Sequence, residues 1–254
     1  MKATVLEYMS DLSPKSRARV TKHFAKEVEE FAILMAKITE TLQCYHARNS
    51  MHDDSNAKEV AFGLMTKGAN TLMAGFELVL TGYKWEPGIL FRSALEGFAV
   101  AWDLVHNHER FALWKARKTF HSTDSISSLK KAIEPVGKMY GLLSNMHVHT
   151  NPISSSPSML LDEGTRKFQF FGLLRPGKEH LRKTEVCFGL FSAYVCLQLT
   201  ELVFHGYSAA LETIERIPGT DTVRTIVSAR HQPFVDAAMA QFRLMANDPD
   251  ASLQ

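Results

Sequence analysis

The chain has 254 residues, of which 45% are hydrophobic and 22% are charged. This balance supports a buried core and excludes a disordered or fibrous chain. Its 29 basic and 27 acidic residues leave a formal charge of +2, so the whole molecule has no field strong enough to indicate nucleic-acid binding. We expect one helical domain over residues 1–254, since a chain of this length can form a single large domain.

The first half of the chain predicts long helices. Ser13-Pro14 is a helix-start signal, and apolar residues then recur at spacings of four and three, which predicts a long N-terminal helix within residues 1–50. The next helix, over 54–83, carries small residues every seven positions: Ala61, Gly68, Gly75 and Gly82. Each glycine costs a helix roughly 1 kcal/mol relative to alanine, so we expect a compensating close approach by the following helix, 87–107.

Shorter elements follow. We expect a helix over 109–120 and another over 125–145, the latter kinked by Pro135 and Gly137. Residues 146–177 form a predicted loop in which 158–171 favours a small β-hairpin. Two C-terminal helices are predicted over 178–246, broken at 217–219. With 54–145 as the central helices, these patterns predict an all-α bundle of six or seven helices.

The sequence also predicts the cellular compartment of this bundle and its relation to membranes. Cys44, Cys187 and Cys196 cannot all pair within one chain, which favours a reducing, cytoplasmic compartment. The first residues, 1–14, lack the apolar core of a signal peptide. The most apolar stretch, 186–200, is shorter than the roughly 18 residues needed to span a bilayer. We therefore expect a buried core helix there and no membrane association.

The least generic feature is a polar loop, 144–158, that carries His147 and His149 between apolar helices. On the helix predicted over 87–107, Arg92 and Glu96 are four residues apart and share a face, so they can pair. Their residue types alone are also typical of an ordinary surface ion pair.

Two runs carry a resemblance to a known family. The run Arg92-Ser-Ala-Leu-Glu96, followed by Tyr140-Gly-Leu-Leu-Ser144-Asn-Met-His147-Val-His149, resembles bacterial helical proteins of the HEPN-like superfamily. The resemblance covers 75–151, about the central third of the chain. It implies a helical bundle that often dimerises and that in many members is an RNase or a nucleotide-binding part of toxin or anti-phage systems.

The usual HEPN motif places a histidine four to six residues after an arginine on a helix. This spacing occurs at Arg17 with His23, Arg175 with His180 and Arg224 with His231. Random order gives a similar number of matches. The first match lies near the start of the first helix, the second crosses a Pro-Gly turn, and no second polar cluster lies near the third. The departure from the family pattern puts RNase activity in doubt.

Two functions stay open. In the first, a HEPN-like homodimer binds a partner or an anionic ligand, a nucleotide or RNA, in a defence or toxin–antitoxin context. In the alternative, the chain is a metal-independent endoribonuclease. Arg92 would then contact the phosphate, His147 or His149 would be the base, and Glu96 would orient one of them.

Local charge favours an anionic ligand. Between 110 and 138, eight basic or histidine positions face two acids, and among them Arg117, Lys118, Lys130 and Lys131 are candidate ligand contacts. A solvated helix face gives the same pattern.

A metal or cofactor is not expected. His147 and His149 could join the 52–54 His-Asp-Asp run as ligands. However, the sequence has no HExxH or CxxC motif, and only Asp103 and His106 have the three-residue spacing of a di-metal helix motif.

Overall fold

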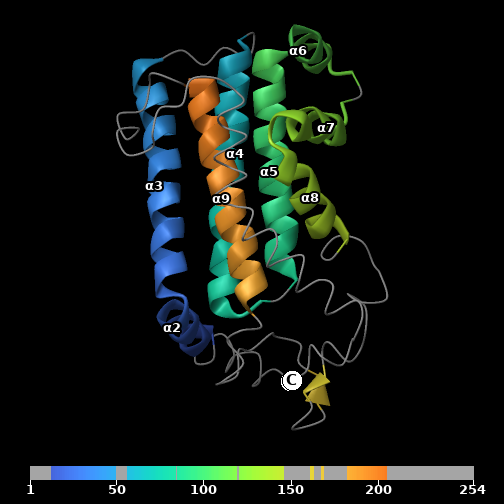
Figure 1. Cartoon of the computed structure of the whole chain (residues 1–254). Helices are drawn as coiled ribbons and strands as arrows, with labels where there is room; N and C mark the ends of the chain where they lie inside the picture. Colours follow the sequence, from blue (N-terminus) through green and yellow to red (C-terminus); the bar gives the residue numbers. More distant parts are fainter. Residues whose placement is uncertain are drawn as a thin grey trace.

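The computed structural model describes residues 13–49, 56–83, 85–118, 120–145, 161–162, 167–168 and 182–204, and all structural statements concern these residues. Eight helices are found in them: α2 (Ser13–His23), α3 (Ala25–Arg48), α4 (Ala57–Thr81), α5 (Glu86–His106), α6 (His108–Lys115), α7 (Ser122–Ala132), α8 (Glu134–Leu143) and α9 (Lys183–Phe204). The long helices α3, α4, α5 and α9 lie side by side, and the shorter α6, α7 and α8 flank α5 (Figure 1). The predicted all-α bundle is confirmed.

Helix α9 lies in front of α4, between α3 and α5 (Figure 1), and contacts all three helices. It is long and apolar enough to cross a membrane, but 83% of its apolar window is buried inside the bundle. The core helix predicted at 186–200 is therefore confirmed. Cys187 and Cys196 are free thiols buried in this helix, and burial raises the pKa of Cys187 to about 11.

Helices α4 and α5 pack closely on each other, as predicted, and the small-residue positions make room for aromatic rings. A Cβ atom at Gly68 would lie 2.7 Å from the ring of Phe98, and one at Gly75 would lie 2.8 Å from the ring of Phe91. Both phenylalanines are fully buried. Gly82 ends α4 in the left-handed conformation, with φ 102°, which glycine adopts without strain. The cost of glycine in α4 is thus offset mainly by ring packing.

The prediction of one long helix within 1–50 is wrong at Phe24, where α2 ends and α3 begins. Phe24 has φ −110° and ψ 40°, and α2 turns there (Figure 1) to pack on α4, where Arg17 pairs with Glu77. Phe24 and Phe31 are both buried. The apolar spacing therefore continues through the break and hides it.

The predicted kinked helix over 125–145 is two helices, and the count of six or seven is correspondingly low. Ile133, with φ −129° and ψ 83°, separates α7 from α8. Pro135 falls in the first turn of α8, where its missing N–H has no intrahelical acceptor to lose. Helix α8 continues into a π-helical turn at Ser144.

Two short strands complete the described elements. β1 (Leu161–Asp162) and β2 (Lys167–Phe168) pair antiparallel, with Leu161 opposite Phe168, inside the range predicted for a hairpin. The helix predicted at 109–120 is shorter, ending at Lys115. Of the predicted C-terminal helices, the residues beyond 204 lie outside the described part of the chain.

Candidate functional site

Arg92 and Glu96 of α5 meet Tyr140 of α8, and we call these three residues the Arg92 cluster. Arg92 Nη2 donates to Tyr140 Oη at 2.9 Å and lies 3.1 Å from Glu96 Oε1. Tyr140 Oη donates to the same Glu96 oxygen at 2.6 Å. The guanidinium carbon also lies 5.0 Å from the centre of the Tyr140 ring. Three polar groups from two helices therefore form a closed triangle of contacts.

This pair differs from an ordinary surface ion pair. The side chains of Arg92 and Glu96 are only 20% and 25% exposed. In a helix, an acid four residues before a base is the more stabilising order, and here the base comes first. Tyr140 supplies the additional contact, and at the C-terminal end of α8 Ser144 Oγ donates to the Tyr140 backbone carbonyl.

The Tyr140 phenol is neutral at neutral pH. Burial raises its pKa above the usual 10.0, the hydrogen bond to Glu96 raises it further, and Arg92 acts in the opposite direction. A neutral phenol donates its proton to Glu96 and accepts from Arg92, as the observed distances require. The cluster therefore holds a guanidinium in place and contains no ionised phenol that could act as a base.

Arg92 has hydrogen-bond donors that no described residue accepts from. Its recorded hydrogen bonds all leave from Nη2, and Nε is buried with no partner among the described residues. An unsatisfied buried donor costs about 1–3 kcal/mol. An arginine whose other donors are free can form paired hydrogen bonds with a carboxylate or phosphate.

His147 and His149, predicted to face Arg92 and Glu96, lie outside the described residues. Their meeting with Arg92 therefore stays a prediction. The alternative metal ligands at 52–54 also lie outside. In the part of the chain that is described, no group of three or more histidines, cysteines or acids is placed to hold a metal ion.

The four predicted anion contacts are exposed at the surface. Arg117 and Lys118 follow α6, and Lys130 and Lys131 lie in the last turn of α7. Arg117 has φ 50°, and the helix end closes through Arg117 N–H to the Trp114 carbonyl and Lys118 N–H to the Leu113 carbonyl, a position where glycine is usual. No ion pair within the described residues joins these four side chains to the Arg92 cluster.

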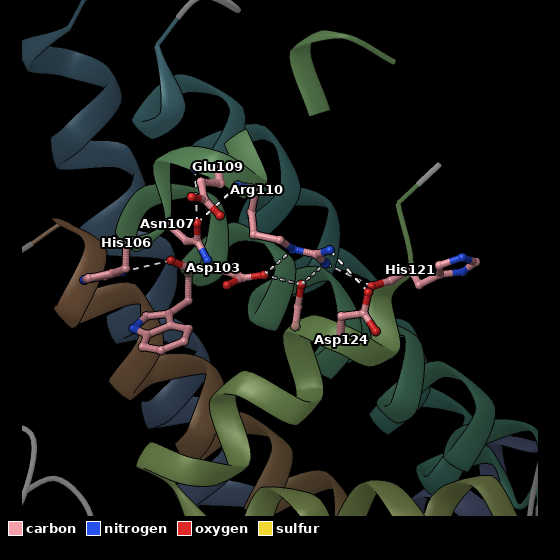
Figure 2. Close-up of polar contacts among 9 residues, drawn as sticks. Asp103, His106, Asn107, Glu109, Arg110, His121 and Asp124 are labelled. Carbon is pink, nitrogen blue, oxygen red and sulfur yellow. Dashed lines mark hydrogen bonds and ion pairs between the residues drawn. The ribbon is translucent and has the colours of Figure 1, made fainter. Parts of the chain in front are cut away.

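The sequence interpretation missed a second polar group around Arg110, which we call the Arg110 cluster: Asp103, Arg110, Asp124 and Ser125 (Figure 2). Arg110 Nε donates to Asp103 Oδ2 at 3.0 Å, and Nη1 donates to Asp124 Oδ2 at 3.3 Å. Nη2 donates to the His121 carbonyl at 3.1 Å and to Ser125 Oγ at 3.2 Å. Ser125 Oγ in turn donates to Asp103 Oδ2 at 2.8 Å.

This second cluster joins α5, α6 and α7. The Arg110 guanidinium also lies 3.9 Å from the centre of the Phe120 ring, so its face is covered as well as its edges. The sequence places Arg110 among the basic residues of 110–138, but this arginine is an internal connector. Tyr140 was within the quoted run Tyr140 to His149, but no local signal in the sequence indicated its contact with Arg92.

The fold and the Arg92 cluster define an all-α bundle with a partly buried arginine on its central hairpin. Comparisons with protein-family models, curated proteins and solved structures give no match. The HEPN-like resemblance therefore stays a prediction from the sequence.

Proposed function

We propose that this chain is a HEPN-like helical protein that binds an anionic ligand, a nucleotide or RNA, with Arg92 as the contact for the anion. The observation that carries the proposal is the half-buried Arg92 guanidinium, fixed by Glu96 and Tyr140 through Nη2 alone. Fixing an arginine in advance reduces the entropy lost when it binds a phosphate.

Binding is favoured over catalysis by the chemistry of the described residues. The cluster offers a cation, a neutral phenol and a carboxylate oxygen that already accepts two contacts. Metal-independent RNA cleavage also requires a base beside the 2′-hydroxyl. That base would have to be His147 or His149, as in the alternative of an endoribonuclease.

The binding test uses fluorescence anisotropy with labelled single-stranded RNA and with a labelled adenine nucleotide. We expect Arg92→Met to weaken binding by about tenfold or more, because a charge-assisted hydrogen bond contributes about 1.5–3 kcal/mol. The matched control is Lys26→Met, which removes the same charge from an exposed position on α3, across the bundle from α8 (Figure 1). Equal weakening in both variants, or no binding by the native chain, would contradict the proposal.

A cleavage assay separates the alternative. The native chain, Arg92→Ala and His149→Ala are incubated with total RNA in EDTA, and folding of each variant is checked by circular dichroism. Cleavage by the native chain that both substitutions abolish would establish the endoribonuclease. Binding without cleavage supports the binding protein.

Two accessory proposals have their own measurements. If Arg117, Lys118, Lys130 and Lys131 contact phosphates, replacing them with glutamine should lower the salt dependence of RNA binding by about 0.7 per lost contact. If the protein is a homodimer, sedimentation equilibrium should give twice the chain mass of 28.5 kDa.

A further inference from the structure

A cavity of about 410 Å³ lies where the end of α5, the start of α6 and the middle of α7 meet. It is a shallow depression, largely open to solvent, with a volume within the roughly 300–1,000 Å³ of small-molecule sites. Trp102, Asp103, His106 and Glu109 are among its lining residues, and no member of the Arg92 cluster is. The cavity is therefore separate from the proposed anion site.

Asp103 is the most buried charged group in this lining, with a side chain only 4% exposed. Both of its recorded hydrogen bonds, from Arg110 Nε and Ser125 Oγ, reach Oδ2. Its other oxygen is turned away from Arg110 (Figure 2). This second oxygen accepts no hydrogen bond from the described residues and is not one of the buried atoms without a partner. It therefore keeps contact with solvent, and a donor that enters the cavity can reach it.

The other polar lining groups also offer acceptors. His106 Nδ1 lies 2.8 Å from the Trp102 carbonyl, and a carbonyl only accepts, so Nδ1 carries the proton and Nε2 of the neutral ring is an acceptor. Glu109 adds a carboxylate in the first turn of α6. Asn107 Oδ1 is already used, because it accepts from the backbone N–H groups of Glu109 and Arg110.

The charge and the aromatic lining of the cavity indicate which class of ligand it can bind. The lining carries the carboxylates of Asp103 and Glu109, and four acceptors already engage the neighbouring guanidinium of Arg110. The indole of Trp102 stacks on the ring of His106 with their centroids 5.0 Å apart, and both rings line the cavity as one aromatic wall. Within the described residues, no metal-binding group of three such side chains exists. Acceptors, net negative charge and an aromatic wall fit an organic cation.

We propose that this cavity binds a small organic cation, an ammonium or guanidinium group on a compact body. The cation would donate to the second oxygen of Asp103 and to Glu109 and would pack its body against Trp102. Neither the Arg92 cluster nor an anionic ligand is needed for this binding.

The test is isothermal titration calorimetry of the full chain with agmatine, which carries both an ammonium and a guanidinium group. We expect saturable binding in the micromolar to low millimolar range, about −8 to −4 kcal/mol. Glu109→Gln should weaken it by about fivefold to tenfold, and Asp103→Asn by more than about tenfold, because both remove a charge that lines the cavity. Glu109 is exposed, so its variant tests the site even if Asp103→Asn does not fold.

Asp124→Asn is the matched control. It removes one negative charge from the Arg110 cluster, but Asp124 is 59% exposed and is not a lining residue. Its affinity for agmatine should stay within about twofold of the native value, since an exposed charge acts weakly across water.

Three outcomes would overturn the proposal. One is no binding of agmatine up to about 10 mM, a concentration far above the expected range. Another is equal weakening by Asp124→Asn and Glu109→Gln, which would mean general attraction to an acidic surface. The third is equal binding of neutral 1,4-butanediol, which would remove the requirement for a cation. Arg92→Met should leave agmatine binding unchanged, so failure here and failure at the anion site are distinguishable.

Discussion

The two arginines that connect α5 to its neighbours, Arg110 and Arg92, differ in how completely their hydrogen bonds are satisfied. Arg110 donates from all three guanidinium nitrogens to four acceptors, and Phe120 covers its face. Arg92 donates from Nη2 alone, and its Nε is buried without a partner among the described residues. Each cluster nevertheless contains an arginine, a carboxylate and a hydroxyl that links them.

This difference in hydrogen bonding separates the structural role of Arg110 from the binding role that we propose for Arg92. A fully satisfied polar network fixes the elements that contribute to it, and the Arg110 cluster fixes α6 and α7 on α5. Unsatisfied buried donors are rare in folded proteins because they cost stability. Arg92 retains such a donor at Nε, and its Nη1 also has no acceptor among the described residues. Because Nη1 is not among the buried atoms and the side chain is one-fifth exposed, a ligand can reach the guanidinium through Nη1.

The largest expected effect is that of Arg110→Ala on stability. Removing this guanidinium leaves the Asp103 carboxylate, 4% exposed, without its charged partner. Breaking a buried ion pair in this way costs about 3–5 kcal/mol. Urea unfolding followed by circular dichroism measures the change. Arg117→Ala at an exposed position is the control and should change stability by less than about 0.5 kcal/mol; similar losses in the two variants would contradict a structural role for Arg110.

The next largest effect should come from Ser125→Ala. Ser125 is fully buried and its hydroxyl links Asp103 to Arg110, so we expect a loss of about 1–2 kcal/mol. The same unfolding assay applies. Ser127, an exposed residue of α7, offers the matched control Ser127→Ala, and equal effects at both positions would show that the hydroxyl of Ser125 makes no specific contribution.

Tyr140→Phe removes the corresponding hydroxyl from the Arg92 cluster and should cost about 1 kcal/mol at neutral pH. The folded-state pKa of Tyr140 lies above its usual 10.0, so its contribution to stability is fully present below about pH 10 and is lost as the pH rises through the folded-state pKa. The difference in unfolding free energy between the native chain and Tyr140→Phe should therefore shrink above pH 10. A difference that grows with pH would contradict the neutral phenol.

The smallest effect on stability should be that of Arg92→Met. This change removes the ion pair with Glu96 but also the unsatisfied Nε, so the net effect should stay within about 1 kcal/mol. Thermal unfolding measures it beside the anisotropy assay. A loss as large as that of Arg110→Ala would mean that Arg92 is also structural and would remove the basis of the comparison.

Sequence patterns predicted what depends on local spacing. The apolar periods located α4, α5 and α9, and a separation of four residues paired Arg92 with Glu96. The break at Phe24 was missed because the apolar spacing continues through it. The break at Ile133 was interpreted as a kink at Pro135.

Contacts between residues far apart in the sequence could not be predicted in the same way. Tyr140 follows Arg92 by 48 positions, and their contact depends on how α8 packs against α5. Arg110 is 14 and 15 positions from Asp124 and Ser125, and nothing in its local pattern separates it from the exposed basic residues around it.

The glycines that receive aromatic rings have a consequence for how this protein can change during evolution. A Cβ atom at position 68 would overlap the ring of Phe98, and one at position 189 would lie 2.6 Å from the ring of Phe76. A relative that gains a methyl group at either position therefore needs a smaller side chain at the partner position. We expect positions 68 and 98, and 189 and 76, to covary in size among relatives, which gives a signature by which distant members of this lineage can be identified.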